Sequence, residues 1–228
     1  MLNYFTKTEK ILWCSSVLLI TGSFLAFGGD GVLTLIASLI GVTSLIFAAK
    51  GNPISPALMI VFSVLYGIIS YSFSYYGEML TYLGMTAPMS VFALVSWLKN
   101  PSSKGHSQVK VSRVTGGEFA VILLLTVAVT VAFYFILRHF HTANLLPSTI
   151  SVATSFLAAA LTFRRSPYFA LAYASNDAVL IVLWGLAALS DISYLSVLIC
   201  FVVFLVNDLY GFISWLKMEK TQAAESVV

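Results

Sequence analysis

Two Asn-Asp pairs lie inside long apolar runs of the sequence, where such residues are rare. Asn176-Asp177 falls in the second-to-last apolar run and Asn207-Asp208 falls in the last. An acid within a lipid-spanning segment is unfavourable unless it faces a cavity, a partner helix or a compensating charge. An amide donates and accepts hydrogen bonds, and a carboxylate attracts cations. The two pairs therefore predict either a polar binding site or hydrogen bonds that join helices.

Both pairs are predicted to lie near the middle of their segments. At about 1.5 Å per residue, Asn176 lies roughly 14 Å and Asp208 roughly 12 Å from the same end of the segments. Aromatic residues share these helix faces, because side chains three, four or seven residues apart lie on one stripe. Amide, carboxylate, phenol and indole groups on adjacent helices suit a flat polar or cationic ring. The candidate substrate-binding residues are Tyr173, Asn176, Asp177, Trp184, Asn207, Asp208 and Tyr210.

Each of these residues also has a purely structural explanation. Intramembrane Asn and Asp can join helices by hydrogen bonds, and the aromatic side chains can simply pack. Trp97 and Trp215 each stand two positions before a Lys, so they are predicted to anchor helices at the membrane interface. Hydroxyl groups are frequent in the run 145–163 and are expected to bond their own helix backbone: Ser148, Thr149, Ser151, Thr154 and Ser155.

The elements that must position these residues follow from composition. Hydrophobic residues make up 59% of the chain and charged residues only 9%, with a mean hydropathy of +0.95. Soluble domains carry about a quarter charged residues. The apolar runs are about 20 residues long without strict alternation, which favours helices over a β-barrel. We therefore predict an all-α integral membrane protein with eight transmembrane helices, at 11–27, 31–49, 54–75, 78–98, 117–138, 145–163, 167–189 and 192–216.

The distribution of positive charge indicates an orientation. With the N-terminus in the cytoplasm, 11 of the 12 Lys and Arg residues fall in cytoplasmic segments, and only Arg138 falls outside. Positive residues are enriched in cytoplasmic loops. The chain is therefore predicted to be a multi-pass protein of the cell (plasma) membrane with both termini cytoplasmic.

A weak internal repeat suggests how the helices are grouped. Ser96-Trp97-Leu98-Lys99 recurs as Ser214-Trp215-Leu216-Lys217, and Ser55-Pro56 recurs as Ser166-Pro167. Parallel repeats of three helices need a linking helix, an arrangement typical of transporters. The predicted parts are an N-terminal accessory transmembrane helix (1–30), a first three-helix bundle (31–99), a polar cytoplasmic loop and linker helix (100–141), a second three-helix bundle (142–217) and a cytoplasmic tail (218–228). Pro88 is expected to kink the fourth span near mid-membrane.

Nothing in the sequence predicts an enzyme. The three histidines, His106, His139 and His141, fall in loops away from the acids of the spans. Cys14 and Cys200 lie in apolar runs without metal-type spacing, so both are expected to be reduced and structural. We expect no cofactor and no metal. The basic loop after the fourth span lacks interleaved aromatic residues, so we expect no nucleic-acid partner.

Four short motifs resemble those of the PnuC family of nicotinamide riboside (vitamin) transporters: Gly77–Met79, Pro88–Pro101, Ser175–Trp184 and Asn207–Trp215. The likeness covers nearly the whole chain from the second span onward. It implies two parallel three-helix bundles joined by a linker helix (3+1+3), in the SWEET-like superfamily, and a homotrimer. It also implies facilitated diffusion of an unphosphorylated vitamin, with uptake driven by intracellular phosphorylation.

The resemblance carries over to particular residues. It implies that Asn176 and Tyr210 face the substrate, and that the other polar residues of the two pairs belong to the motif of this subgroup. Some members carry a tryptophan-rich stripe where this chain has residues 169–173, which contain no tryptophan. The expected function is a uniporter for nicotinamide riboside. The alternatives are a related transporter of riboflavin, thiamine or a nucleoside, proton-coupled transport, a membrane-embedded enzyme, or an assembly protein.

Overall fold

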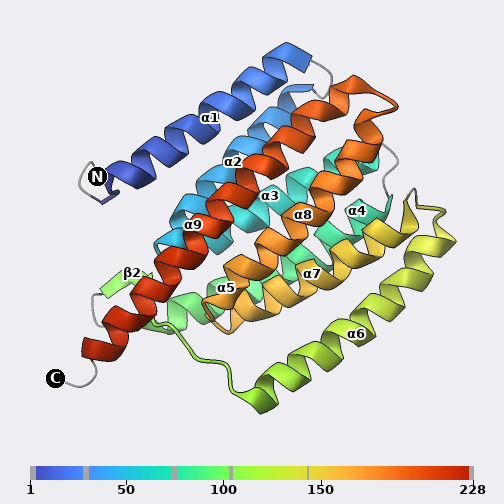
Figure 1. Cartoon of the computed structure of the whole chain (residues 1–228). Helices are drawn as coiled ribbons and strands as arrows, with labels where there is room; N and C mark the ends of the chain where they lie inside the picture. The colour runs from blue at the N-terminus through green and yellow to red at the C-terminus, as the bar shows by residue number, and fades with distance from the viewer. Residues whose placement is uncertain (1–3, 28–30, 73–75, 103–104, 143, 226–228) are drawn as a thin grey trace.

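The computed structural model describes residues 4–27, 31–72, 76–102, 105–142 and 144–225. Eight segments in this described part are long and apolar enough to cross a membrane, so the predicted all-α fold of eight transmembrane helices is confirmed (Figure 1). Seven are single helices: α1 (Lys7–Phe27), α2 (Gly31–Ala49), α3 (Ile54–Ser72), α6 (Gly116–His139), α7 (Leu145–Phe163), α8 (Tyr168–Ala188) and α9 (Leu195–Glu225). The short 3₁₀ helix η2 (Ile192–Tyr194) precedes α9.

The fourth transmembrane segment is broken in the middle. It consists of α4 (Tyr76–Thr81), the π-helical turn η1 (Tyr82–Thr86) and α5 (Ala87–Lys99). The backbone N–H of Ala87 donates to the carbonyl of Tyr82, five residues earlier. Pro88 has no N–H to bond the carbonyl four residues before it, and single π-helical turns often occur at functional sites. The irregularity expected at Pro88 therefore takes the form of a π-helical turn.

The helices pack as two groups with one helix at each edge. In one group α2 packs on α3 and α3 packs on α5, whereas in the other α8 lies between α7 and α9. The groups meet where α2 contacts α9 and where α5 contacts α7. Helix α1 covers α2 and α9 at one edge, and α6 packs on α7 at the other (Figure 1).

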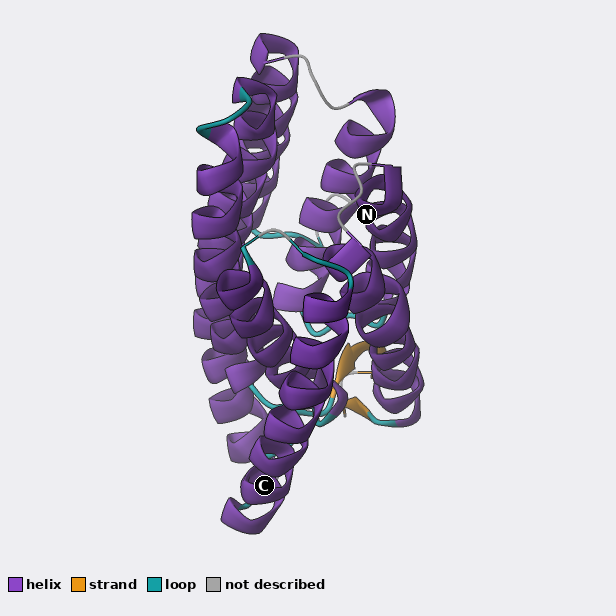
Figure 2. Ribbon diagram, turned by 90° about the vertical axis from the view of Figure 1, so that its right-hand side faces the viewer, coloured by secondary structure: helices purple, strands orange, loops and turns teal. Residues whose placement is uncertain are grey.

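The two ends of the molecule differ. Both termini and the hairpin of β1 (Pro101–Ser102) and β2 (Gly105–Val109) lie at one end, which we call the termini side (Figures 1 and 2). The turn between α8 and α9 lies at the other end, which we call the turn side. The hairpin is fixed to the bundle because the N–H of Val109 donates to the carbonyl of Gly51. Gln222 of α9 also bonds Val109 and Val111, so α9 continues well beyond the predicted span and most of the predicted tail is helical. Residues 226–228 of that tail lie outside the described residues.

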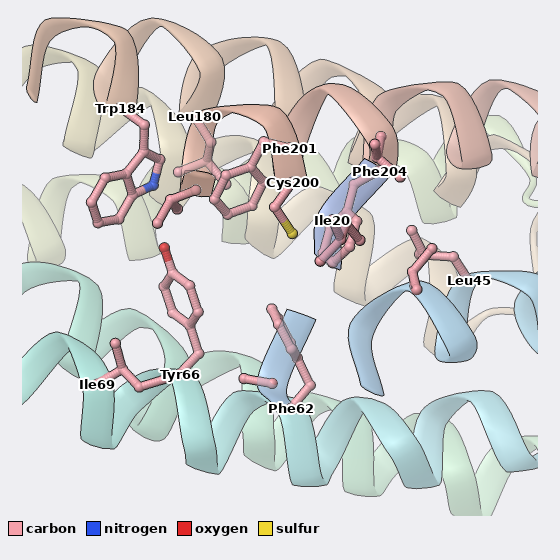
Figure 3. Close-up of a cluster of buried hydrophobic side chains, with 14 of the residues drawn as sticks. Ile20, Leu45, Phe62, Tyr66, Ile69, Leu180, Trp184, Cys200, Phe201 and Phe204 are labelled. Atoms are coloured by element: carbon pink, nitrogen blue, oxygen red, sulfur yellow. The ribbon is translucent and has the colours of Figure 1, made fainter. Parts of the chain in front are cut away.

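A core rich in aromatic side chains joins the two groups of helices. Phe62 and Tyr66 of α3 contact Phe204 and Phe201 of α9, respectively, and Leu180 of α8 belongs to the same cluster (Figure 3). Helix α2 approaches this core closely at Gly41, where an added Cβ atom would lie 2.5 Å from the Phe204 ring. Glycine allows this approach because it has no side chain.

Candidate functional site

Asn176 lies in the middle of α8, where it joins α8 to α7. Its side chain is buried, and its Oδ1 accepts hydrogen bonds from Thr154 Oγ1 at 2.8 Å, Ser155 Oγ at 3.0 Å and Ser151 Oγ at 3.3 Å. The expectation that these hydroxyl groups bond their own helix backbone is confirmed for Thr149 and Thr154, but Ser151, Thr154 and Ser155 also donate across to α8. Three donors on one acceptor fix the register of the two helices beside Asp177.

Asp177 and Asp208 face each other between α8 and α9. Each side chain is 4% exposed, and the two carboxyl groups lie close enough to interact directly. The Oδ2 atom of Asp177 has no hydrogen-bond partner among the described residues. Two negative charges in contact within a low-dielectric interior repel strongly. The pair can therefore hold one negative charge together with one proton, and it can exchange that proton or attract a cation.

Asn207 and Tyr210 lie on the face of α9 that points toward α1. Asn207 Nδ2 donates to Ser16 Oγ at 2.9 Å, and Tyr210 Oη donates to Glu9 Oε1 at 3.4 Å. The structure therefore does not bring these two residues together with Asn176 and Asp177. Nothing in the sequence indicated that α1, expected to be an accessory helix, would bind α9 through buried polar side chains.

The two aromatic candidates on α8 mark opposite ends of the helix. Tyr173 is half-buried on the termini side and packs edge-on against Phe169, with ring centroids 6.2 Å apart. Trp184 is buried on the turn side, 5.6 Å from the ring of Tyr194. Eleven residues separate them, which is about 16 Å along a helix. The two side chains therefore lie at different depths of α8, and the single pocket of seven residues stays a prediction.

Two of the cavities lie where the two groups of helices meet, whereas others lie elsewhere: one of about 820 Å³ between α1 and α2, and one of about 580 Å³ at the start of α6. A vestibule of about 530 Å³ on the turn side is lined by Glu78, Trp184 and Tyr194, together with Ser148 and other residues of the α6–α7 and α8–α9 turns. On the termini side there is a cavity of only about 20 Å³. It lies between helices α2, α3 and α5 of one group and helices α7 and α8 of the other. This cavity holds about one water molecule. Neither the vestibule nor this small cavity is lined by Asp177 or Asp208, so the site predicted between the last two helices stays a prediction.

The rim of the vestibule carries a negative charge. Asp191 lies in the turn between α8 and η2, outside the membrane-spanning segments, and its Oδ1 accepts a hydrogen bond from the N–H of Ser193 at 2.9 Å. This hydrogen bond lowers the pKa of the Asp191 carboxyl below its ordinary value. A carboxylate that is held ionised attracts cations toward the vestibule.

Two tryptophans close the path between the two groups of helices on the termini side. Trp97 and Trp215 lie with ring centroids 5.4 Å apart, and Phe169 packs edge-on against Trp215 at 4.9 Å. Trp97 is 1% and Trp215 0% exposed. The prediction that they anchor helices at the membrane interface is therefore wrong. Their position could not be read from the adjacent Lys residues, because it depends on where the two groups of helices meet.

The indole N–H groups of Trp97 and Trp215 make equivalent hydrogen bonds in the two groups of helices. Trp97 Nε1 donates to the carbonyl of Thr162 at the end of α7, and Trp215 Nε1 donates to the carbonyl of Ala48 at the end of α2. The preceding serines repeat the pattern, since Ser96 Oγ donates to Phe163 and Ser214 Oγ to Ala49. Each group of helices is thus bound to the first helix of the other group.

The sequence reasoning missed two buried acids, Glu9 of α1 and Glu78 of α4. Glu78 of α4 is 4% exposed, and its Oε2 has no hydrogen-bond partner among the described residues. The signal that singled out Asp177, an acid within an apolar span, was present here too. Glu78 lies close to the predicted start of its span, where a charged residue is ordinary.

Comparison with known proteins gives three matches. The sequence profile described as "Nicotinamide mononucleotide transporter" matches residues 31–217. The chain is 26% identical over 221 residues to the nicotinamide riboside transporter PnuC of Neisseria mucosa, an alignment that covers 95% of this chain and 84% of that protein. It superposes with a TM-score of 0.81 on a crystal structure of the vitamin B3 transporter PnuC, covering 96% of this chain and 94% of the other at 23% identity. The last match supports the fold.

Proposed function

We propose that this chain, which belongs to the nicotinamide mononucleotide transporter family, is a membrane uniporter for nicotinamide riboside. The observation that carries the proposal is the pair of Asp177 and Asp208, buried and in contact with each other between α8 and α9. A pair that holds one negative charge complements one positive charge. The pyridinium ring of nicotinamide riboside supplies that charge together with a flat aromatic face.

The charges along the path favour the riboside over its phosphorylated form. The vestibule is lined by the acids Glu78 and Asp191, and no Lys or Arg is among the described residues that line either the vestibule or the termini-side cavity. A phosphate group would enter without a cationic partner, which is unfavourable in a desolvated site. An unphosphorylated cation meets no such barrier, and phosphorylation inside the cell would then prevent its return.

We assign the substrate-facing roles to Asp177, Asp208, Tyr173 and Trp184. Trp184 offers an aromatic face at the vestibule, and Tyr173 lies beyond the acids on the termini side. Asn176 positions α8 through its bonds to α7. Asn207 and Tyr210 then act indirectly, by docking α1 on α9.

Transport by reconstituted protein tests the proposal. Proteoliposomes with the purified chain are expected to take up radiolabelled nicotinamide riboside saturably until the inside and outside concentrations are equal. Vesicles loaded with a nicotinamide riboside kinase and ATP are expected to accumulate the label beyond that level. Protein-free vesicles are the control. No saturable flux of the riboside, or equal flux of the phosphorylated mononucleotide, would contradict the proposal.

Proton-coupled transport is a second candidate, because the acid pair can hold a proton as well as a cation. Entry of a cation between the two acids would then release that proton toward one side. A pH gradient across the vesicle membrane would drive accumulation in this case, whereas a uniporter reaches the same final level with or without it. Competition by excess riboflavin or thiamine tests the other vitamins, of which thiamine is also cationic.

Several broader features belong to the same proposal. We place both termini in the cytoplasm and the protein in the cell membrane, and we group the helices as two parallel repeats joined by α6, as in SWEET-like transporters. The equivalent bonds of Trp97 and Trp215 support the repeats. A homotrimer is the assembly we expect, and the mass of the detergent-solubilised protein measured by light scattering tests it.

A further inference from the structure

Glu78 is a buried acid to which the transport path gives no role so far. It lies in the first turn of α4, next to Gly77, and no ion pair to it is formed within the described part of the chain. An added Cβ atom at Gly77 would lie 2.6 Å from Leu137 and 2.9 Å from Thr142, so the backbone here is held tightly. A desolvated carboxylate oxygen without a partner is unfavourable. Within the described residues, this carboxylate oxygen is therefore left to bond a ligand from the vestibule.

Aromatic side chains surround this acid. Tyr66 of α3 and Tyr82 of the π-helical turn η1 pack with ring centroids 4.5 Å apart, and Glu78 is close enough to interact electrostatically with both. The Tyr66 hydroxyl points across the interface toward Trp184 of α8 (Figure 3). It is buried, and it interacts with the side chain of Trp184 across the interface. Both groups of helices therefore contribute to one cluster of three aromatic rings and a carboxylate.

This cluster is open on one side. Glu78 and Trp184 both line the turn-side vestibule, whose volume lies within the range of small-molecule sites. On the other side Tyr82 is also within electrostatic range of Asp177. The cluster thus stands between the open vestibule and the closed acid pair.

We propose that Glu78, with the rings of Tyr66, Tyr82 and Trp184, forms a receiving subsite for a flat organic cation on the turn side of the protein. A carboxylate selects the charge of such a ligand, and aromatic faces select its planar shape. The subsite takes the cation before it reaches Asp177 and Asp208. The identification of that cation as a pyridinium nucleoside rests on the proposed function, whereas the preference for a cation rests on Glu78 alone.

A matched pair of ligands and two variants test this inference. The ligands are nicotinamide riboside, which is a cation, and its dihydro form, which is neutral and nearly identical in shape. Calorimetry on the purified full-length protein is expected to show tighter binding of the cation. In Glu78→Gln the dissociation constant for the cation rises about tenfold or more, and that for the neutral form stays within about twofold. Glu219→Gln removes a carboxylate of similar size on the termini side, and it is expected to leave both constants unchanged.

Additional measurements distinguish an error in the proposed site from misfolding of a variant and from an error in the proposed substrate. Glu78→Asp keeps the charge and is expected to keep part of the preference for the cation, and monodisperse elution checks folding of each variant. If folded Glu78→Gln binds both ligands as the unaltered protein does, or loses both equally, the subsite is overturned. If the unaltered protein binds neither riboside form, the proposed function fails. In that case the subsite is tested with the cation 1-methylnicotinamide and with neutral nicotinamide. If Glu78→Gln leaves the ratio of their dissociation constants unchanged, the subsite is overturned.

Discussion

The amide oxygen of Asn176 illustrates how one polar residue serves both packing and function. It accepts three hydrogen bonds from hydroxyl groups of α7, and the next residue, Asp177, faces Asp208 of α9. Side-chain hydrogen bonds between helices in a membrane stabilise modestly, because the unfolded state also finds partners. Several bonds to one atom still fix the helix position, and here they fix the position of the neighbouring acid.

Removing this amide is expected to weaken both stability and binding. Asn176→Ala deprives three hydroxyl groups of α7 of a shared acceptor and is expected to lower the free energy of unfolding by about 1–2 kcal/mol. Thermal unfolding of the protein in detergent measures this change. Ser175→Ala is the control, because Ser175 is exposed and bonds only the carbonyl of Leu171. Equal melting temperatures for the two variants would show that the three bonds carry no stability.

The sequence was informative about which residues are polar within the spans, and less so about what they contact. The acids could be singled out because the unfavourable free energy of a buried charge makes such residues rare in apolar runs. The partner of each residue depends on helix rotation and on the neighbours across the interface. For this reason Asn207 was predicted beside the acids although it binds Ser16 of α1. For the same reason Glu78 was overlooked.

At the scale of elements, the two Ser-Trp motifs bind the two groups of helices to each other. Helices α2 and α7 are each followed, two residues after their last residue, by a residue with positive φ: Gly51 at 65° and Arg165 at 57°. Just before these turns, carbonyl groups accept the indole N–H of Trp215 and Trp97, respectively. The repeat noted in the sequence therefore has a physical counterpart, although its first role is closure of the path and not anchoring at the lipid surface.

Both tryptophans are expected to contribute to stability to a similar extent. Trp97→Phe and Trp215→Phe keep an aromatic ring but leave a buried carbonyl without its donor, so each is expected to lower the free energy of unfolding by about 1 kcal/mol. Denaturation followed by circular dichroism measures the change. Trp13→Phe is a matched control, because Trp13 also donates a hydrogen bond but is 39% exposed. A loss at Trp13 as large as at Trp215 would contradict a special role for the closure.

The break in the fourth span could be expected from the sequence, but its form could not. Pro88 removes one backbone donor, and a kink or a π-helical turn are both physically allowed responses. The structure has the π-helical turn Tyr82–Thr86. That turn places Tyr82 against Tyr66 and within range of both Glu78 and Asp177. The position of the open space between the two groups could not be predicted either, because it depends on contacts between helices that the sequence pattern of one helix does not specify.

At the scale of the whole molecule, the space where the two groups of helices meet is open on the turn side and closed on the termini side. The vestibule has a volume of about 530 Å³, whereas the cavity below the acids holds about one water molecule. Eight spans and the all-α class were predicted correctly, because composition and segment length determine them strongly. The orientation in the membrane stays a prediction from the distribution of Lys and Arg.

Chemical labelling of single cysteines tests that orientation. In a variant with Cys14 and Cys200 replaced by Ala, Ser190→Cys places a thiol on the exposed turn side and Ser107→Cys places one on the exposed termini side. A membrane-impermeant maleimide added to intact cells is expected to label position 190 and spare position 107. A permeant maleimide is expected to label both positions. The reverse pattern would mean that the vestibule faces the cytoplasm.

Uptake of radiolabelled nicotinamide riboside by proteoliposomes carrying Asp177→Asn, Asp208→Asn or both is the most direct test of the transport path. Because one negative charge can be shared by the two acids, either single substitution leaves one acid to hold it and is expected to raise the KM less than about threefold. The double substitution removes the charge and is expected to raise the KM about tenfold or more, beyond the product of the single effects. Unchanged uptake by the folded double variant would show that the substrate does not pass the acid pair.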